Sequence, residues 1–206
     1  ALLFGMYNVG YQHFHATGAA GGFWEMFIYG FLAVLPKIIV SYVVGLGIEF
    51  VVAQWKKEEI QEGFLVSGIL IPMIVPVDCP LWILAVATAF SVIFAKEVFG
   101  GTGMNVFNVA LITRAFLFFA YPTKMSGDAV WVSGDSIFGL GQSVDGLTVA
   151  TPLGAAATSG AVPEFSWDMV TGLIPGSIGE TSVIAIALGA ILLLWTGIAS
   201  WKTMFS

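Results

Sequence analysis

The chain has 206 residues, of which 58% are hydrophobic and only 10% are charged. Soluble domains carry about a quarter charged residues, so this composition excludes an ordinary soluble domain and predicts an integral membrane protein. The net charge of −6 argues against a nucleic-acid partner, and the single Cys79 excludes an internal disulfide and argues against a cysteine metal site.

Residues 1–7 contain no initiator methionine, no basic region and no small-residue cleavage site, so we do not expect them to be a signal peptide. We expect them to be the end of a membrane helix, and the chain to be a segment of a longer polypeptide. The chain has two histidines, His13 and His15, and two histidines alone are weak evidence for a metal site. We interpret them as part of a polar loop or an interface. The sequence therefore predicts no metal site.

Residues 30–55 form the first predicted membrane span, because a spanning helix needs about 20 mostly apolar residues. Lys56 and Lys57 follow it and place that end on the cytoplasmic side by the positive-inside rule. An ionisable residue inside a span costs about 2–3 kcal/mol unless it has a partner, so Glu49 is a functional candidate. The alternative is that Glu49 reaches water at the cytoplasmic end.

The next apolar stretch is interrupted by Pro72, Pro76 and Pro80, which cannot all lie inside one helix. We predict two short helices, 64–75 and 81–97, joined by a non-helical break. At membrane depth such a break needs cover from protein or a water-filled cavity, and it is typical of transporter-like folds. Asp78, inside the break, is interpreted as a cap of the following helix or as a functional carboxylate.

A glycine-rich turn leads to a predicted helix at 105–120, which is too short to cross a membrane alone. Asn105 and Asn108 are three residues apart, so we expect them on one face of this helix. Amides at such positions commonly cap helices or join them. Arg114 is expected to pair with a carboxylate or with a phosphate.

Residues 121–180 form a more polar region rich in glycine, serine and threonine, and residues 181–200 form the last predicted span. The polar region contains the run DGLTVAT at 145–151, which ends in Thr151. Gly146 allows another backbone or a ligand to approach closely, and a threonine that is to be modified should lie on an exposed loop. On spacing alone, the run is equally a turn with two solvent-facing threonines.

Several runs over nearly the whole chain resemble the family formed by the B subunits of sodium-translocating NADH:quinone oxidoreductases. They are EGF at 62–64, KEVFGGTG at 96–103, RAFLFFAYP at 114–122, SGD at 126–128, DGLTVAT at 145–151 and IPGSIGE at 174–180. The D-type subunit of the Rnf complex shares the architecture and the 145–151 loop. The runs at 114–122 and 126–128 favour the sodium pump.

The resemblance implies an all-α integral membrane protein, a helical bundle with broken and half helices. It further implies an inverted-repeat architecture similar to that of urea transporters, of which this chain covers most of the first repeat. The second repeat and the cytoplasmic N-terminal part of the family lie outside the chain. The location that the resemblance implies is the bacterial cell inner membrane, with several spans.

The resemblance also implies cofactor positions. Thr151 matches the threonine that carries FMN through a phosphoester, on a loop of the outer face that includes Asp145, Gly146 and Thr148. Asn105 and Asn108 match a pair that lies against a second flavin, the non-covalent riboflavin.

Two further positions match the family within the first predicted span. Glu49 matches an acidic residue associated with sodium movement, and Gly45 matches a glycine near the quinone site. The chain departs from the family in four places: it has Met104 where a basic residue is common, Val109 where proline is usual, Val149 where a small residue is usual, and Leu46 within the double glycine of the quinone site.

The implied function is a membrane subunit of a redox-driven sodium pump, which passes electrons from NADH towards ubiquinone and exports Na⁺. The chain would be an enzyme only as part of a complex, with no catalytic side chain of its own. The implied partners are the other subunits of a six-subunit complex, membrane lipid and a flavinyltransferase. The alternatives are a D-type subunit of the Rnf complex and a non-redox channel for a small solute.

Overall fold

The structure is a computed structural model that describes residues 1–57, 63–128, 130–160, 165–179 and 182–204. Every regular element in these ranges is a helix, and the single isolated β-bridge pairs Ile137 with Leu140. The expectation of an all-α protein is therefore confirmed for the described residues.

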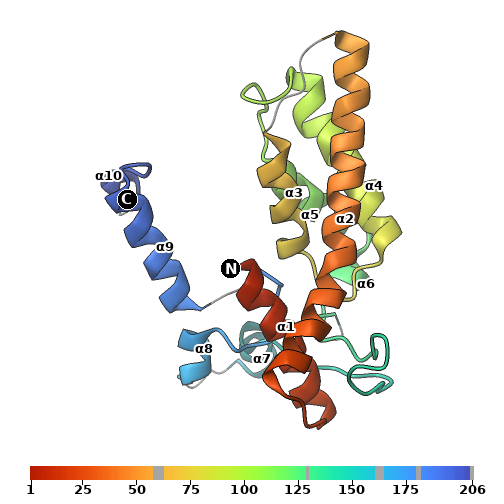
Figure 1. Cartoon of the computed structure of the whole chain (residues 1–206), viewed down its shortest axis with the longest axis vertical. Helices are drawn as coiled ribbons and strands as arrows, with labels where there is room; N and C mark the ends of the chain where they lie inside the picture. Colours follow the sequence, from red (N-terminus) through yellow and green to blue (C-terminus); the bar gives the residue numbers. More distant parts are fainter. Residues whose placement is uncertain (58–62, 129, 161–164, 180–181, 205–206) are drawn as a thin grey trace.

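Helices α1 (Leu2–Thr17) and α2 (Phe23–Lys56) form a hairpin, with α1 packed against the lower part of α2 (Figure 1). Gly10 and Gly30 lie at the crossing, where a side chain on either would overlap the backbone carbonyl of the other helix, at Met26 and Met6. Small residues let apolar helices approach this closely. His13 lies within α1 and is fully buried, so the prediction of a polar loop there is wrong.

Helix α2 begins at Phe23, earlier than the predicted Gly30, and extends over 34 residues. Pro36 lies inside it without ending it, although proline removes one backbone donor. The next residue, Lys37, is buried and its Nζ donates to the Ala33 carbonyl oxygen at 3.0 Å. The buried ammonium group of Lys37 thus finds a hydrogen-bond acceptor within its own helix.

Helices α3 (Phe64–Ile74) and α4 (Leu81–Ser91) are separated by the break that the prolines predict. Val75, Val77 and Cys79 in the break are buried, so protein covers it. The residue that caps α4 is Pro80, which makes the interpretation of Asp78 as a helix cap wrong. After α4 the chain continues as a π-helical turn, η1 (Val92–Lys96), and a 3₁₀ turn, η2 (Glu97–Phe99).

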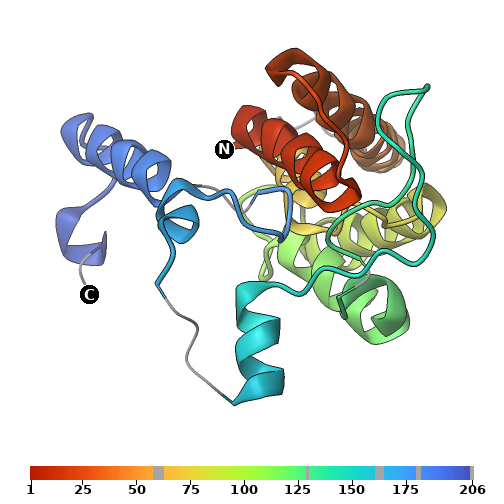
Figure 2. The same ribbon diagram turned by 90° about the horizontal axis from the view of Figure 1, so that it is seen from below.

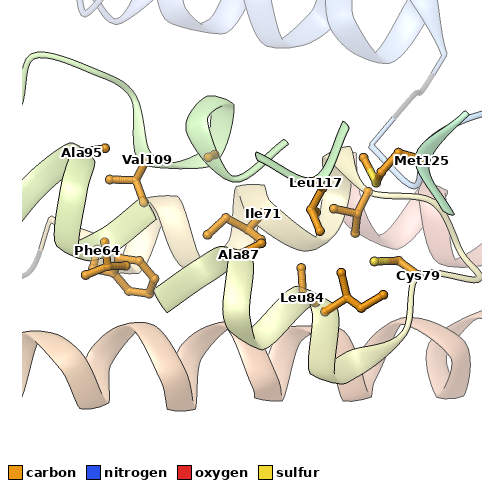
Figure 3. Packing of buried hydrophobic residues seen from close by; sticks show 13 residues of the cluster. Phe64, Ile71, Cys79, Leu84, Ala87, Ala95, Val109, Leu117 and Met125 are labelled. Carbon is orange, nitrogen blue, oxygen red and sulfur yellow. The ribbon is translucent and has the colours of Figure 1, made fainter. Parts of the chain in front are cut away.

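Helix α5 (Val109–Ala120) packs against both α3 and α4 and completes the main hydrophobic core (Figure 3). The side chains of this core come from α3, the break, α4, η1 and α5, together with Met125 after α5, and Phe64, Ile71, Leu84 and Leu117 are fully buried. Two helical stretches, Phe23–Lys56 and Leu81–Phe99, are long and apolar enough to cross a membrane.

The remaining helices are short or stand apart. α6 (Pro122–Met125), α7 (Pro152–Ser159) and α8 (Trp167–Thr171) belong to the polar region, which was predicted without helices. Helices α9 (Val183–Trp195) and α10 (Trp201–Met204) stand away from the bundle (Figures 1 and 2), and α9 has no buried residue.

Candidate functional site

Thr151 lies at the end of an extended segment and caps the N-terminus of α7. Its Oγ1 accepts a hydrogen bond from the Gly154 backbone N–H at 3.0 Å, which fixes the side chain at the first turn. Thr151 is half-buried, whereas Ala150 before it and Leu153 after it are exposed. The threonine therefore lies on an accessible loop, as a residue modified by another protein requires.

The segment before Thr151 turns at Gly146, whose φ of 71° is the left-handed conformation that glycine adopts without strain. Asp145 and Thr148 are exposed on this segment. The Val149 N–H donates to the Asp128 carbonyl oxygen at 2.9 Å and holds the segment against the chain that follows α6. An open pocket of about 220 Å³ adjoins the turn and is lined by Asp78, Gly134, Asp135, Val144, Asp145, Gly146 and Leu147.

The loop region is anchored to the base of α1 and α2. His13 Nδ1 donates to the Ser133 carbonyl oxygen at 2.7 Å, and the Tyr29 hydroxyl donates to the Asp135 carbonyl oxygen at 2.6 Å. The His13 and Tyr29 rings stack with their centroids 4.1 Å apart. Two buried rings of the bundle thus fix the backbone that leads to the 145–151 segment.

Asn105 and Asn108 do not share a helix face, because both precede the first residue of α5. Asn108 caps α5, its Oδ1 accepting from the N–H groups of Ala110 at 2.9 Å and Leu111 at 3.3 Å. Asn105 is engaged within the preceding turn, where its Nδ2 donates to the Phe107 carbonyl oxygen at 3.1 Å. The paired amide edge that a flavin ring would need is not formed by these two side chains.

Glu49 lies in the upper half of α2 and is buried, with only 4% of its surface exposed. Its Oε1 accepts from Lys96 Nζ, and the two side chains form an ion pair between α2 and η1. The alternative that Glu49 reaches water is therefore wrong. Lys96 is also 4% exposed, so the pair is shielded from solvent on both sides.

Gly45 lies one helical turn before Glu49 and is buried against the ring of Phe64 from α3. A side chain at this position would overlap the ring. The geometry gives Gly45 a packing role, since it lets α3 approach α2.

Sequence reasoning missed the roles of two basic residues. Among the described residues no carboxylate pairs with Arg114; its Nη1 donates to the carbonyl oxygen of Ile74, the last residue of α3, at 2.9 Å. Lys96 was not recognised as the partner of Glu49. The available signal was that Lys96 is the one basic residue in the predicted helix 81–97, and a basic side chain in an apolar segment calls for a partner.

Among the described residues, no group of three or more histidine, cysteine, aspartate or glutamate side chains is placed to hold a metal ion. Apart from Asn105 and Asn108 before α5, the site residues fall into two separate places. One is the exposed threonine loop beside α7, and the other is the buried ion pair between α2 and η1.

Comparison with known proteins gives a consistent result. The sequence profile of the NQR2, RnfD, RnfE family matches residues 1–206. The B subunit of the Na(+)-translocating NADH-quinone reductase of Chromohalobacter salexigens is 42% identical over 229 aligned residues, which cover 99% of this chain and 53% of that relative.

The same subunit from Ectopseudomonas mendocina is 42% identical and that from Azotobacter vinelandii 41% identical; each alignment covers 98% of this chain and 55% of the relative. The chain thus spans about half the length of these curated relatives. Family membership and the two apolar spans together identify a membrane protein. The match along the full chain shows that it belongs to the NQR2, RnfD, RnfE family.

Proposed function

We propose that the chain is the membrane part of a subunit of a redox-driven sodium pump, which passes electrons from NADH towards ubiquinone and exports Na⁺. The names of the relatives support this class of complex. The observation that carries the redox assignment is the position of Thr151, on an accessible loop at the N-terminus of α7.

A phosphoester on Thr151 fits its surroundings. Helix N-termini favour negative charge because their backbone N–H groups are free and the helix dipole is positive there. Pro152 contributes no N–H, but proline at the first helical position leaves the helix intact. When bound, FMN supplies one-electron redox chemistry, and the residues of the chain hold it at the surface of the membrane domain. The exposed Asp145, Gly146 and Thr148 would face the flavinyltransferase.

We also propose riboflavin near Asn105 and Asn108 and ubiquinone near Gly45, on the family resemblance. The geometry supplies no support of its own for either, since both amides are engaged locally and the Gly45 surface is covered by Phe64.

For sodium, the support is the buried carboxylate of Glu49. An ionisable side chain inside an apolar span is costly and is retained mainly where it serves transport or a proton path. We propose that Glu49 contributes to the sodium pathway. We also propose an architecture of two inverted repeats, of which this chain covers most of the first. The complex would have six subunits and lie in the bacterial inner membrane, which this subunit would cross several times.

The covalent flavin is tested on native protein isolated from its own membranes. After denaturation, the band should fluoresce under ultraviolet light, and the peptide containing Thr151 should carry the added mass of one FMN. Thr151→Ala should abolish both signals. Thr158→Ala is the matched control, because Thr158 is another exposed threonine, within α7, and it should leave both signals unchanged.

A native protein without the added mass would contradict the redox assignment and favour a non-redox solute channel. The electron acceptor used by the assembled complex distinguishes the remaining alternative. Oxidation of NADH that requires ubiquinone supports the sodium pump, whereas electron transfer between ferredoxin and NAD, without ubiquinone, would identify a D-type subunit of the Rnf complex.

A further inference from the structure

The ion pair between Glu49 and Lys96 is buried between α2 and η1. Each residue has 4% of its surface exposed, and Lys96 Nζ donates to Glu49 Oε1. Removing two charges from water is costly, and a buried pair loses much stability when either partner is taken away. While it is ionised, the carboxylate is therefore stabilised by a cation beside it.

The π-helical turn η1 sets the direction of Lys96. A π turn holds more residues per turn than an α-helix, so it changes which side chains face the core, and such turns are frequent at functional sites. Val92, Ala95 and Lys96 are buried, while Ile93 and Phe94 are 38% and 56% exposed. The local change of helix type thus directs the ammonium towards α2.

The pair leaves one oxygen of the carboxylate unused. Glu49 Oε2 is buried and has no hydrogen-bond partner among the residues that the structure describes. An ionised carboxylate has about four acceptor positions, so a buried oxygen without a partner is an open position for a further cation or donor. On the other side of the pair, the Phe64 ring centroid lies 6.0 Å from Lys96 Nζ.

We propose that Lys96 is the resident cation of a monovalent-cation site on Glu49, which sodium enters by displacing the Lys96 ammonium. This inference rests on the sodium role proposed above for Glu49 and adds the group that competes with the ion. One cation replaces another, so the carboxylate stays neutralised throughout. The displaced ammonium keeps its proton and its charge.

A second carboxylate, on the residue after Lys96, is partly exposed. The Glu97 side chain is 13% exposed, and its Oε2 lies 3.7 Å from Lys56 Nζ, whose side chain is 35% exposed. Glu97 directly follows Lys96 in the chain. The proposal places the displaced ammonium near this carboxylate, which already lies in a partly hydrated pair.

The competition makes a quantitative prediction for the native complex. If Lys96 must leave before sodium binds, removing its charge should raise the affinity of the site for sodium. A site that is open for only a fraction of the time has its apparent affinity reduced by that fraction. If the Lys96 ammonium occupies the site about nine-tenths of the time, Lys96→Gln should lower the sodium concentration that half-saturates ubiquinone reduction by about tenfold. Lys124→Gln removes the same charge from an exposed side chain on α6 and should leave the half-saturating concentration unchanged.

Lys96→Arg keeps the ion pair and tests whether a stronger competing cation weakens sodium binding. A guanidinium can bind both oxygens of a carboxylate, so it would also occupy Oε2. The half-saturating sodium concentration should therefore rise. Values unchanged from the native protein in both Lys96 variants would overturn the proposal.

Labelling of the unsubstituted complex provides a readout that requires no variant. Reductive methylation of lysines should modify Lys96 more in sodium chloride than in choline chloride, because displacement exposes the ammonium. The exposed Lys124 should be modified equally in both salts. Equal modification of Lys96 in the two salts would contradict displacement.

The two proposals fail in different ways. A native complex whose ubiquinone reduction ignores sodium would overturn the pump assignment, whatever the labelling of Lys96 shows. Sodium-stimulated reduction combined with sodium-independent labelling of Lys96 would remove the competing lysine alone.

Discussion

Two glycines in α2, Gly45 and Gly47, lie two residues apart and have opposite surroundings. Gly45 is buried against the Phe64 ring, whereas no atom would lie within 4 Å of a side-chain carbon at Gly47. Nothing in the sequence distinguishes the two glycines, so it does not predict which of them is in contact with another helix. Contact depends on the approach of α3, a tertiary feature that helix periodicity does not specify.

We predict that Gly45→Ala destabilises the protein by about 1–3 kcal/mol, because the added methyl group overpacks the core at Phe64. Gly47→Ala should be neutral or stabilising by up to about 1 kcal/mol, because alanine favours the helix and meets no neighbour. Thermal unfolding of the two purified variants measures the difference. Equal unfolding temperatures would show that α3 does not pack on Gly45.

At the scale of elements, the sequence predicts the break between α3 and α4 well, because three prolines constrain the backbone directly. It predicts the start of α5 poorly. The end of the glycine-rich turn indicated a helix from residue 105, but Asn108 uses its side chain as a cap, so the helix begins at Val109. The same residue types serve helix faces and caps, and only the backbone conformation distinguishes the two.

The π turn η1 was also outside the reach of the sequence. Nothing in residues 92–96 distinguishes a π turn from the α-helix before it, so the sequence does not predict the direction in which Lys96 points, although a basic residue in an apolar segment does call for a partner. The ionisable residue itself was found, because a charge in an apolar span stands out. The exposed Thr151 loop was found for a similar reason, since Gly146 and the neighbouring polar residues interrupt an apolar chain.

Arg114 connects α5 to the end of α3, so its substitution should destabilise the end of α3. Its hydrogen bond to the Ile74 carbonyl oxygen comes from a charged donor, which contributes about 1.5–3 kcal/mol. Arg114→Met should lower the free energy of unfolding by about this amount and speed hydrogen exchange in residues 71–79. Arg114→Lys keeps a charged donor and should lose less. Unchanged exchange in Arg114→Met would show that the bond does not hold the end of α3.

At the scale of the whole molecule, the loop that bears Thr151 depends on the helical hairpin at its base. His13 and Tyr29 come from α1 and α2, and each donates to a backbone carbonyl of the segment 133–135. The side chain of Thr151 is itself far along the chain from both. Its position follows from contacts that long-range folding creates, which sequence patterns cannot specify.

Tyr29→Phe tests this dependence. The change removes the hydroxyl that donates to the Asp135 carbonyl oxygen at 2.6 Å and should cost about 0.5–1.5 kcal/mol. Residues 133–147 should then exchange amide hydrogens faster. Tyr42→Phe is a matched control, because it removes a 2.6 Å hydrogen bond to the Leu65 carbonyl oxygen on α3 and does not touch the loop. If both variants accelerate exchange in residues 133–147 equally, or neither does, the loop is not held by Tyr29, and the hairpin does not position the segment that leads to Thr151.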